Sequence, residues 1–335
     1  MKLAVLSFND YQRYFRRGLC EAAEESGTRT LYVQWGKQID FLRRGEIQTA
    51  LPCDASIGDV ARKIREFAQG DRMCIVDSMA FHCVHKAFLL RRNLRDSIWI
   101  YDVFDYFFYD STGKILFIKK IKDWLNGKMA DKVMVLSQNL IEVYPSAFHL
   151  DNASHLQPAG KRGKPRKSVA VLASFDARFD YGLMADLAEL LPDFAFHFHG
   201  WIKDDSAKIK SALDELAARR SNVVYHGPYS NAELDELLND YDIGLLPYVQ
   251  NHVLTRYVNP DKLYHYLCKG MEAVATPIPQ ARAMRDRVHL AGGAREFAQK
   301  LRAIAENGLA LNGGDFHLSN NWQTRWREFL SFVER

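Results

Sequence analysis

Short apolar strands alternate with helical segments twice along this chain, and this repeated alternation limits the fold more than any other feature of the sequence. Residues 2–7 and 31–33 read as strands flanking a helix predicted at 11–26, and strand–helix–strand spacing of this kind forms a parallel sheet. The second half restarts the pattern with a strand at 169–173 and a helix at 181–191. Further strands are predicted at 73–77, 98–102, 132–137, 194–199, 223–225, 243–247 and 273–276. The alternation predicts an α/β protein with two doubly wound, Rossmann-like sheets.

Residues 157–167 separate the two series. This stretch is rich in proline, glycine and basic residues and lacks hydrophobic periodicity, which is typical of a solvated connection. A chain of 335 residues also exceeds the size of one ordinary core. The predicted organisation is an N-terminal domain at 1–157, a linker at 158–167, a C-terminal domain at 168–318, and a final helical segment at 319–335 that packs back toward the N-terminal domain.

The composition is that of a soluble globular protein, with 47% apolar and 26% charged residues. No run of about 18 uncharged apolar residues and no signal-peptide pattern occurs, so neither a membrane span nor export is expected. The five cysteines are odd in number and scattered, which favours a reducing, cytoplasmic setting over a disulfide framework. The net charge is only +4, too weak to indicate a nucleic-acid binder.

Several motifs that would indicate other enzymes are missing. A dinucleotide fold would carry G-x-G-x-x-G after the first strand, but residues 8–13 contain no glycine, so a nicotinamide or flavin dehydrogenase is not expected. The chain has no Walker loop, no G-x-S-x-G elbow and no H-E-x-x-H pair. His197 and His199 share one face of a predicted strand but lack a third ligand at a supporting spacing, so no metal site is predicted.

Residues 257–270 carry the main candidate site. Asn259 is a good N-cap residue, and Pro260 suits the first helical position because it has no amide hydrogen to leave unpaired. Leu263 begins an apolar i, i+4 pattern that indicates a helix. Lys262 then lies in the first turn, where a cation opposes the helix dipole unless an anion is bound there as well. The pattern is typical of a phosphate site, although a solvated surface lysine gives the same sequence.

Two carboxylates follow the strand predicted at 98–102. Asp102 ends this strand and Asp105 lies just beyond it. The carboxyl ends of parallel strands are where α/β proteins place groups that face a ligand. Capping of the next helix is the alternative role for both residues.

The segment from Lys114 to Lys128 interleaves an apolar stripe and Trp124 with several lysines. A helix of this composition can lie on an anionic bilayer. An ordinary packed helix with a solvated basic face is the alternative.

Three motifs at 222–229, 232–248 and 259–264 together resemble the donor domain of GT-B-fold glycosyltransferases. The similarity is strongest to the bacterial polysaccharide-assembly enzymes of the large family 4, and the chain is also similar to the glucuronosyltransferase of xanthan synthesis. The resemblance extends over most of residues 168–335 and is looser in the first half. It implies two Rossmann-like domains facing a cleft.

What the resemblance implies is a cytoplasmic enzyme that binds a nucleotide diphosphate sugar in its second domain. Lys262 and the helix amides would hold the diphosphate and neutralise charge on the leaving group, so that no metal or other cofactor is expected. The base and ribose of the nucleotide would lie near Gly200, Gly227 and Tyr248. The donor-binding residues implied are Gly200, Gly227, Tyr248, Asn259, Lys262, Leu263 and His265.

The acceptor implied by the resemblance is lipid-linked or a growing polysaccharide, bound in the first domain. Asp105 is the general base if the reaction inverts configuration, because such a displacement needs a carboxylate near the acceptor hydroxyl. If the reaction retains configuration, Asp105 orients the acceptor instead. Asp102 is the second catalytic candidate, and the helix from Lys114 to Lys128 would lie at the inner membrane surface.

The sequence departs from the family pattern at several positions. Family 4 enzymes usually carry glutamate where this chain has His265, and Gly-Lys-Pro-Val-Val-Ala where residues 270–275 read Gly-Met-Glu-Ala-Val-Ala. Ser174 takes the place of the usual glycine after the first strand of the second domain. The changes at His265 and Glu272 leave a catalytically silent binding subunit as one alternative, and a nucleotide-sugar epimerase on the same fold is the other.

Overall fold

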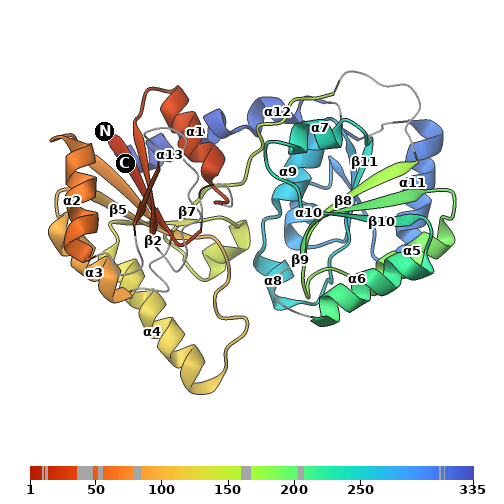
Figure 1. The fold of residues 1–335 in the computed structure, drawn as a ribbon, viewed down its shortest axis with the longest axis horizontal. Helices are drawn as coiled ribbons and strands as arrows, with labels where there is room; N and C mark the ends of the chain where they lie inside the picture. Colours follow the sequence, from red (N-terminus) through yellow and green to blue (C-terminus); the bar gives the residue numbers. More distant parts are fainter. Residues whose placement is uncertain are drawn as a thin grey trace. The chain divides into compact units, whose positions relative to one another are not determined.

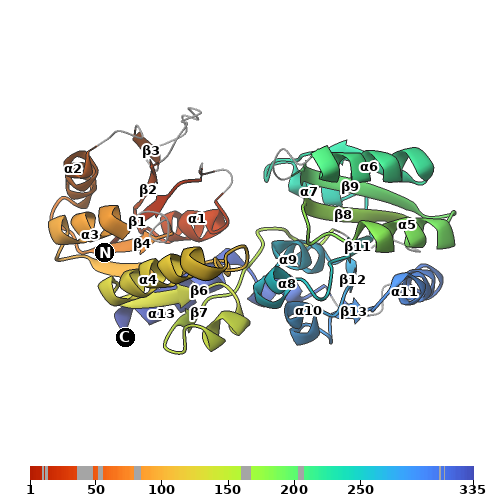
Figure 2. The ribbon, with the colours of Figure 1, turned by 90° about the horizontal axis from the view of Figure 1, so that it is seen from below.

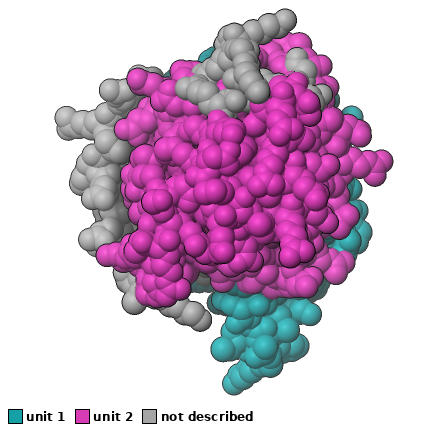
Figure 3. Space-filling view, turned by 90° about the vertical axis from the view of Figure 1, so that its right-hand side faces the viewer, with its two compact units in different colours: residues 1–151, 322–335 teal, residues 152–321 magenta. Residues whose placement is uncertain are grey.

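The computed structural model describes residues 1–9, 11, 14–35, 48–51, 56–78, 84–159, 167–202, 207–308, 311–312 and 314–335. These residues form two compact units, shown in separate colours in Figure 3. Unit 1 comprises Met1–Asp151 and Trp322–Arg335, and unit 2 comprises Asn152–Asn321.

The chain leaves unit 1 after Asp151 rather than after residue 157, which corrects the predicted domain boundary. The reason is local hydrogen bonding. The side-chain amide of Asn152 donates to the carbonyl of Asn259 at 2.7 Å, and the Ser154 amide donates to the carbonyl of Asn320 at 3.1 Å, so these residues are fixed to unit 2. Most of the linker predicted at 158–167 lies outside the described residues.

Unit 1 is built on a parallel sheet whose described strands have the order β3-β2-β1-β4-β5-β6-β7. The central strands are buried along nearly their whole length, because parallel sheets are covered on both faces. The strands are β1 (Lys2–Ser7), β2 (Thr30–Trp35), β3 (Gln48–Leu51), β4 (Met73–Asp77), β5 (Ile98–Val103), β6 (Lys132–Val135) and β7 (Phe148–His149).

Helices cover both faces of this sheet. Right-handed crossovers on opposite sides of β1 place α1 on one face and the series α2, α3 and α4 on the other, an arrangement that can be followed in Figures 1 and 2. The helices are α1 (Arg17–Glu25), α2 (Ile57–Ala68), α3 (Val84–Asn93), α4 (Gly113–Met129) and α13 (Trp322–Glu334), with a 3₁₀ turn η2 at Gln138–Glu142. Helix α1 therefore begins later than the predicted residue 11.

The last helix, α13, completes unit 1 by packing beside α1. The Trp322 side chain occupies the space over Gly18, where an added Cβ would come within 2.2 Å of the indole. Trp326 is 1% exposed. The ring of Phe332 stacks on that of Phe148, with 4.5 Å between the centroids. The first and last parts of the chain thus share one core.

Unit 2 is built on a second parallel sheet, whose described strands have the order β10-β9-β8-β11-β12-β13. The strands are β8 (Ser168–Phe175), β9 (Ala195–Ile202), β10 (Val223–Gly227), β11 (Ile243–Leu246), β12 (Glu272–Ala275) and β13 (Val288–Leu290). The helices are α5 (Tyr181–Leu190), α6 (Ala207–Arg219), α7 (Leu234–Leu238), α8 (Val253–Tyr257), α9 (Asp261–Cys268), α10 (Pro279–Ala283), α11 (Ala294–Asn307) and α12 (Phe316–Ser319).

Two cores cover the two faces of this sheet. Val169 and Val171 of β8 join α5, α6 and α11 on one face, while Ala170 and Leu172 join α7, α9 and α10 on the other. This alternation follows from the two-residue period of a strand. The two described sheets confirm the predicted α/β class with two doubly wound units.

Helix α9 is fixed against the sheet by Tyr266. Its ring lies over Gly244, where an added Cβ would come within 2.4 Å of the ring, and its hydroxyl accepts a hydrogen bond from the Leu172 amide at 2.7 Å. The side chains of Leu263 and Leu267 are fully buried in the same core. These contacts hold the first turn of α9 in place at the carboxyl end of the sheet.

Candidate functional site

The strand order of unit 2 reverses between β8 and β11. Strands β9 and β10 extend the sheet from β8 in one direction, and β12 and β13 extend it from β11 in the other. In open α/β sheets, ligands bind outside the carboxyl ends of the strands at such a switch point. The loops after β8 and β11 are tied together there, because the Val249 amide donates to the Arg178 carbonyl at 2.8 Å and the Asp180 amide to the Pro247 carbonyl at 2.9 Å.

Two cations with adjacent carboxylates lie in the segments at this end of unit 2. Arg178 follows β8, and its guanidinium contacts the Asp176 carboxylate at 2.6 Å. Lys262 lies in the first turn of α9, and its ammonium contacts the Asp261 carboxylate, also at 2.6 Å. Burial raises the pKa of Tyr248, which follows β11, and the charges of both cations and both carboxylates also act on this pKa. The structure thus adds Arg178 to the residues proposed from sequence.

Lys262 is where the sequence predicts it, although its helix begins one residue later than predicted. The N-cap is Pro260 rather than Asn259, and Asp261 is the first helical residue. Burial lowers the pKa of Lys262, but the Asp261 carboxylate outweighs this effect, so that the pKa lies above its ordinary value. The side chain of Lys262 is 15% exposed and that of Asp261 is 44% exposed. The pair is therefore open to solvent on its acidic side and is not a sealed internal ion pair.

His265 lies one turn along α9 from Asp261. Burial lowers the pKa of its imidazole to about 4, with Asp261 opposing the shift and Lys262 adding to it. The ring is consequently neutral at pH 7 and can donate or accept a hydrogen bond without adding charge. Its Nδ1 lies 2.9 Å from the hydroxyl of Ser154.

The other predicted donor-binding residues are placed less directly. Asn259 is 4% exposed, and its carbonyl accepts from Asn152, so it shapes the approach to α9. Leu263 belongs to the core, which leaves only its backbone for a ligand. Gly227 ends β10 with φ +84°, in the left-handed region that favours glycine.

The strand predicted at 194–199 does not stop before Gly200, because β9 runs to Ile202. Gly200 lies inside β9, paired with Ala173 of β8. Its φ is +147°, and an added Cβ would lie 1.7 Å from the Ala173 carbonyl oxygen. Glycine is needed here because two backbones approach each other closely.

In unit 1, the structure separates the two predicted carboxylates. Asp102 is 1% exposed, and both its oxygens lie 3.2 Å from Nε of the buried Arg16. Its Oδ2 also accepts from the Ser78 hydroxyl at 3.0 Å. Burial raises the pKa of Asp102, and the Arg16 charge opposes the rise. This placement corrects the catalytic assignment of Asp102, because the carboxylate is enclosed and serves to fix β5.

Asp105 lies beyond the carboxyl end of β5 and is partly exposed. Its Oδ1 accepts from the Tyr106 amide at 2.8 Å, which orients the carboxylate. Of the two predicted carboxylates, Asp105 is the one that a substrate can reach.

The two histidines of β9 pair with other side chains. His197 Nδ1 lies 2.8 Å from His226 Nε2, and His199 Nε2 lies 2.9 Å from the Tyr241 hydroxyl. Within the described part of the chain, no group of three or more His, Cys, Asp or Glu side chains is arranged to hold a metal ion.

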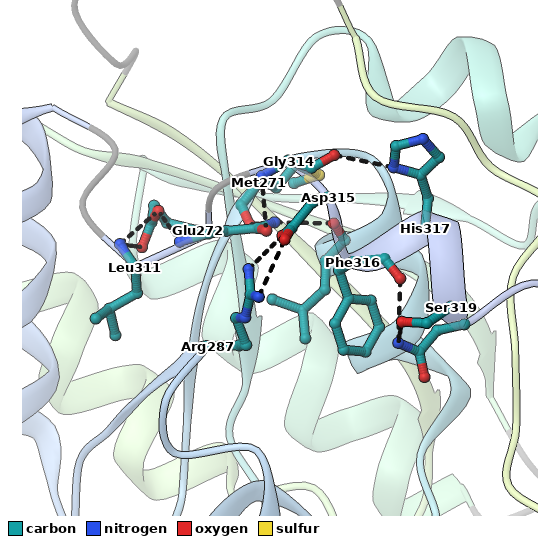
Figure 4. Close-up of polar contacts among 12 residues, drawn as sticks. Met271, Glu272, Arg287, Leu311, Gly314, Asp315, Phe316, His317 and Ser319 are labelled. Atoms are coloured by element: carbon teal, nitrogen blue, oxygen red, sulfur yellow. Dashed lines mark hydrogen bonds and ion pairs between the residues drawn. The ribbon is translucent and has the colours of Figure 1, made fainter.

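Glu272 stands where the family pattern has another residue, and Figure 4 shows its contact with Leu311. Its fully buried carboxylate accepts from His289 Nε2 at 2.6 Å, from the Leu311 amide at 3.1 Å and from the Asn312 amide at 2.9 Å. Glu272 lies at the amino end of β12, whereas Lys262 lies near the carboxyl ends of the strands. The substitution therefore anchors residues 311–312 and does not touch the candidate site.

Replacing Glu272 with alanine is expected to lower the free energy of unfolding by about 3–5 kcal/mol, because His289 and two buried amides lose their acceptor. Burial raises the pKa of Glu272, but the hydrogen bonds from His289 and the two amides lower it below its ordinary value of 4.5. A depressed folded pKa means that this stabilisation is complete above pH 4.5 and is lost as the pH falls through the folded value.

Urea unfolding at pH 7 and in the acid range would measure this effect. The difference between wild type and Glu272→Ala should shrink as the pH falls. As a control, Glu215→Ala removes an exposed carboxylate paired with Arg219 and should cost less than about 1 kcal/mol. Equal losses in the two variants would contradict the anchoring role.

Comparison with known proteins places this architecture among glycosyltransferases. A scan against protein-family models finds no match. The Bacillus subtilis (strain 168) protein named "Putative teichuronic acid biosynthesis glycosyltransferase TuaH" is 26% identical over 167 residues, which are 49% of this chain and 41% of that protein. The match thus spans less than half of the relative's length.

Solved structures match over the whole chain at low sequence identity. Anabaena Alr3699/HepE in complex with UDP-glucose aligns with a TM-score of 0.72 at 13% identity, covering 100% of this chain and 99% of that one. A glycosyltransferase from Rickettsia africae ESF-5 aligns with a TM-score of 0.69 at 14% identity, covering 99% of this chain and 97% of that one. An α,α-trehalose-phosphate synthase (UDP-forming) from Burkholderia vietnamiensis aligns with a TM-score of 0.61 at 13% identity, covering 99% of this chain and 98% of that one. The chain therefore has the GT-B fold of glycosyltransferases, as its sequence motifs predict.

Proposed function

We propose that this protein transfers a sugar from a nucleotide diphosphate sugar to a lipid-linked or growing polysaccharide acceptor. The observation that carries the proposal is the Lys262 ammonium in the first turn of α9, held at the carboxyl end of a sheet whose switch point also carries Arg178. Two similar proteins support the class of substrate. Anabaena Alr3699/HepE was solved in complex with UDP-glucose, which supports a nucleotide sugar as donor, and the Bacillus subtilis protein TuaH is named for teichuronic acid biosynthesis, which supports a polysaccharide as acceptor.

The diphosphate is the group that this arrangement suits. Lys262, Arg178 and the first amides of α9 supply positive charge where the nucleotide leaves, which stabilises the charge that develops on the leaving group. Because these groups already neutralise the diphosphate, the proposal requires no metal ion. Tyr248 and the neutral His265 lie beside the same turn and are proposed to contact the nucleoside, with Gly200 and Gly227 shaping the neighbouring strand ends.

Donor binding would exchange one partner of Lys262 for another. The Asp261 carboxylate is 44% exposed, so water can take the place of the ammonium as its partner when Lys262 turns away. A diphosphate offers more charge and more acceptor oxygens than one carboxylate, so the ammonium can turn to it at small cost.

The acceptor is proposed to bind to unit 1, with Asp105 beside its hydroxyl. If the reaction inverts configuration, Asp105 takes the hydroxyl proton as general base. If configuration is retained, Asp105 accepts a hydrogen bond from the hydroxyl and orients it.

A panel of nucleotide diphosphate sugars, each with and without candidate acceptors, would test this proposal. Acceptor-dependent release of the nucleotide diphosphate together with a longer glycan is the expected result. Conversion of the donor into a stereoisomer without acceptor would indicate an epimerase. Donor binding without any turnover would indicate a silent subunit. Either of these results would overturn the transfer reaction.

We further propose that α4 brings unit 1 to the inner surface of a membrane. No helix in the described ranges is long and apolar enough to span a bilayer. Helix α4 nevertheless turns Asp123 and Asn126 inward, and Asp123 accepts hydrogen bonds of 2.7 Å from the hydroxyls of Tyr101 and Tyr144. Its outward side carries the exposed residues Ile115, Phe117, Ile118, Ile121, Trp124 and Leu125, interspersed with lysines.

Replacing Phe117 and Trp124 with aspartate is expected to weaken binding to vesicles that contain phosphatidylglycerol by about tenfold or more, because the two rings lose their place in the bilayer interface. These side chains are 64% and 60% exposed, so the fold should tolerate the change. Co-sedimentation at low salt measures the binding. Leu318→Asp, at a position 68% exposed in unit 2, is the control, and unchanged binding by the α4 variant would contradict the proposal.

A further inference from the structure

A separate hollow of about 250 Å³ lies in unit 1 between the end of α3 and the end of α4. It is lined by Phe88, Arg91, Arg92, Arg95 and Met129. Helices α3 and α4 lie side by side in Figures 1 and 2 and pack against each other. The hollow therefore adjoins the helix that carries the exposed apolar side chains.

The lining is cationic, because three arginines line the hollow and none of its lining residues is acidic. An adjoining hollow of about 420 Å³ shares Arg91 and Arg95 but also has Asp96, Asp131 and Glu334 in its wall. Arg72, Lys132 and Arg335 also line this larger hollow, so five cationic residues stand beside three carboxylates there, whereas no carboxylate lines the smaller one. An anion would therefore be attracted to the smaller hollow.

One of the three arginines is a fixed part of the wall. Arg91 donates to the carbonyl of Ser97 at 2.6 Å and pairs with the Asp131 carboxylate. Arg92 and Arg95 are exposed, and Nε of Arg95 donates to the Arg92 carbonyl at 3.2 Å. A basic residue near the carboxyl end of a helix is stabilised by the helix dipole, and this effect explains the presence of one arginine at the end of α3. The two other arginines line the same hollow, and guanidinium groups suit phosphate oxygens because they donate in pairs.

The remaining wall is apolar. Phe88 is 47% exposed and Leu89, next to it, is 38% exposed, while Met129 ends α4. Inorganic phosphate or a sugar phosphate would gain nothing from these side chains. A phosphate that carries a glycerol and acyl chains would contact both the arginines and the apolar surface.

We infer that the hollow lined by Arg91, Arg92 and Arg95 binds the headgroup phosphate of an anionic phospholipid. The inference rests on the proposed contact between α4 and a membrane, and it does not depend on sugar transfer. It differs from that contact because the lysines of α4 attract any anionic surface, whereas this hollow holds one lipid phosphate in a defined place.

The test uses a short-chain phosphatidylglycerol as a monomer, titrated into the full chain and followed by calorimetry. One lipid should bind per chain. The variant Arg92→Gln/Arg95→Gln should weaken this binding by at least about tenfold, since one hydrogen bond to a charged group is already worth about that much. The control Lys120→Gln/Lys122→Gln removes the same charge from exposed positions on α4 and should change the affinity less than about twofold.

Three results would overturn the inference. Equal weakening in both variants would show a diffuse charge effect, and no binding to the wild-type chain would exclude the site. Inorganic phosphate that binds as tightly as the lipid, through the same arginines, would exclude the lipid as ligand. If the double variant does not fold, Arg92→Lys keeps the charge and should still weaken binding by removing the paired donors.

Nucleotide diphosphate release with a soluble acceptor separates this inference from the proposed sugar transfer. The arginine variant should release nucleotide diphosphate at the wild-type rate. Lipid binding without any transfer by the wild-type chain would refute the proposed function alone, and transfer without arginine-dependent lipid binding would refute the lipid site alone.

Discussion

Replacing Lys262 with methionine is expected to lower kcat for nucleotide diphosphate release about 100- to 1000-fold. Loss of one preorganised group that stabilises developing charge costs about this much in other enzymes. Methionine fills most of the space of the lysine stem, so the packing of α9 should be preserved. Steady-state release of the nucleotide diphosphate, measured at saturating donor, would give the change in kcat.

The matched control for this variant is Lys300→Met. Lys300 is exposed on α11, so removing its charge changes the net charge equally without touching the candidate site. Its kcat should stay within about twofold of wild type. Asp261→Asn gives a second check, because it leaves Lys262 without its acidic neighbour and should tighten binding of the nucleotide diphosphate. An unchanged rate in Lys262→Met would remove the proposed donor site.

Asp105→Asn should lower the rate of transfer by about 100- to 10,000-fold if the enzyme inverts configuration, because a general base contributes that much. If it retains configuration, the loss should be below about tenfold, since an amide oxygen still accepts a hydrogen bond from the acceptor hydroxyl. Donor binding should be unchanged in both cases. Initial rates with saturating donor and varied acceptor would measure the effect, and the anomeric configuration of the product would identify which case applies.

Asp110→Asn is the control for this variant. Asp110 follows in the same segment, is exposed and pairs with Lys119, so its loss should leave transfer near the wild-type rate. A product of inverted configuration, formed at an undiminished rate by Asp105→Asn, would exclude Asp105 as the base.

The sheet strands could be predicted from sequence where a short apolar run stands between polar or glycine-rich residues. Residues 73–77 were predicted with the bounds that β4 has, because a strand buried on both faces needs every side chain to be apolar or paired. The end of β9 could not be found in this way. Gly200 looks like a stop signal, but its missing Cβ serves contact with Ala173 on the neighbouring strand, which local sequence does not reveal.

A residue of the candidate site could be predicted from sequence only where its side chain is unfavourable in the local secondary structure. Lys262 stands out because a cation in a first helical turn is unfavourable without an anion. Arg178 has no such conflict, and its importance comes from the switch point between β8 and β11, which requires the strand order. Asp102 is a catalytic candidate in the sequence because it ends a strand, and its buried pairing could not be foreseen because its partner Arg16 is 86 positions away in the chain. Burial of a carboxylate depends on such distant partners.

Unit 1 is formed by two separate parts of the chain, and this determines when it can finish folding during synthesis. Residues 1–151 emerge from the ribosome before unit 2, yet the indole that covers Gly18 and the ring that stacks on Phe148 belong to α13, which is translated after unit 2. Unit 2, which is continuous in sequence, has all its parts before that helix is translated. The second unit to be made is thus the first that can be completed, and separate expression of the first 151 residues would yield a sheet with one flank uncovered.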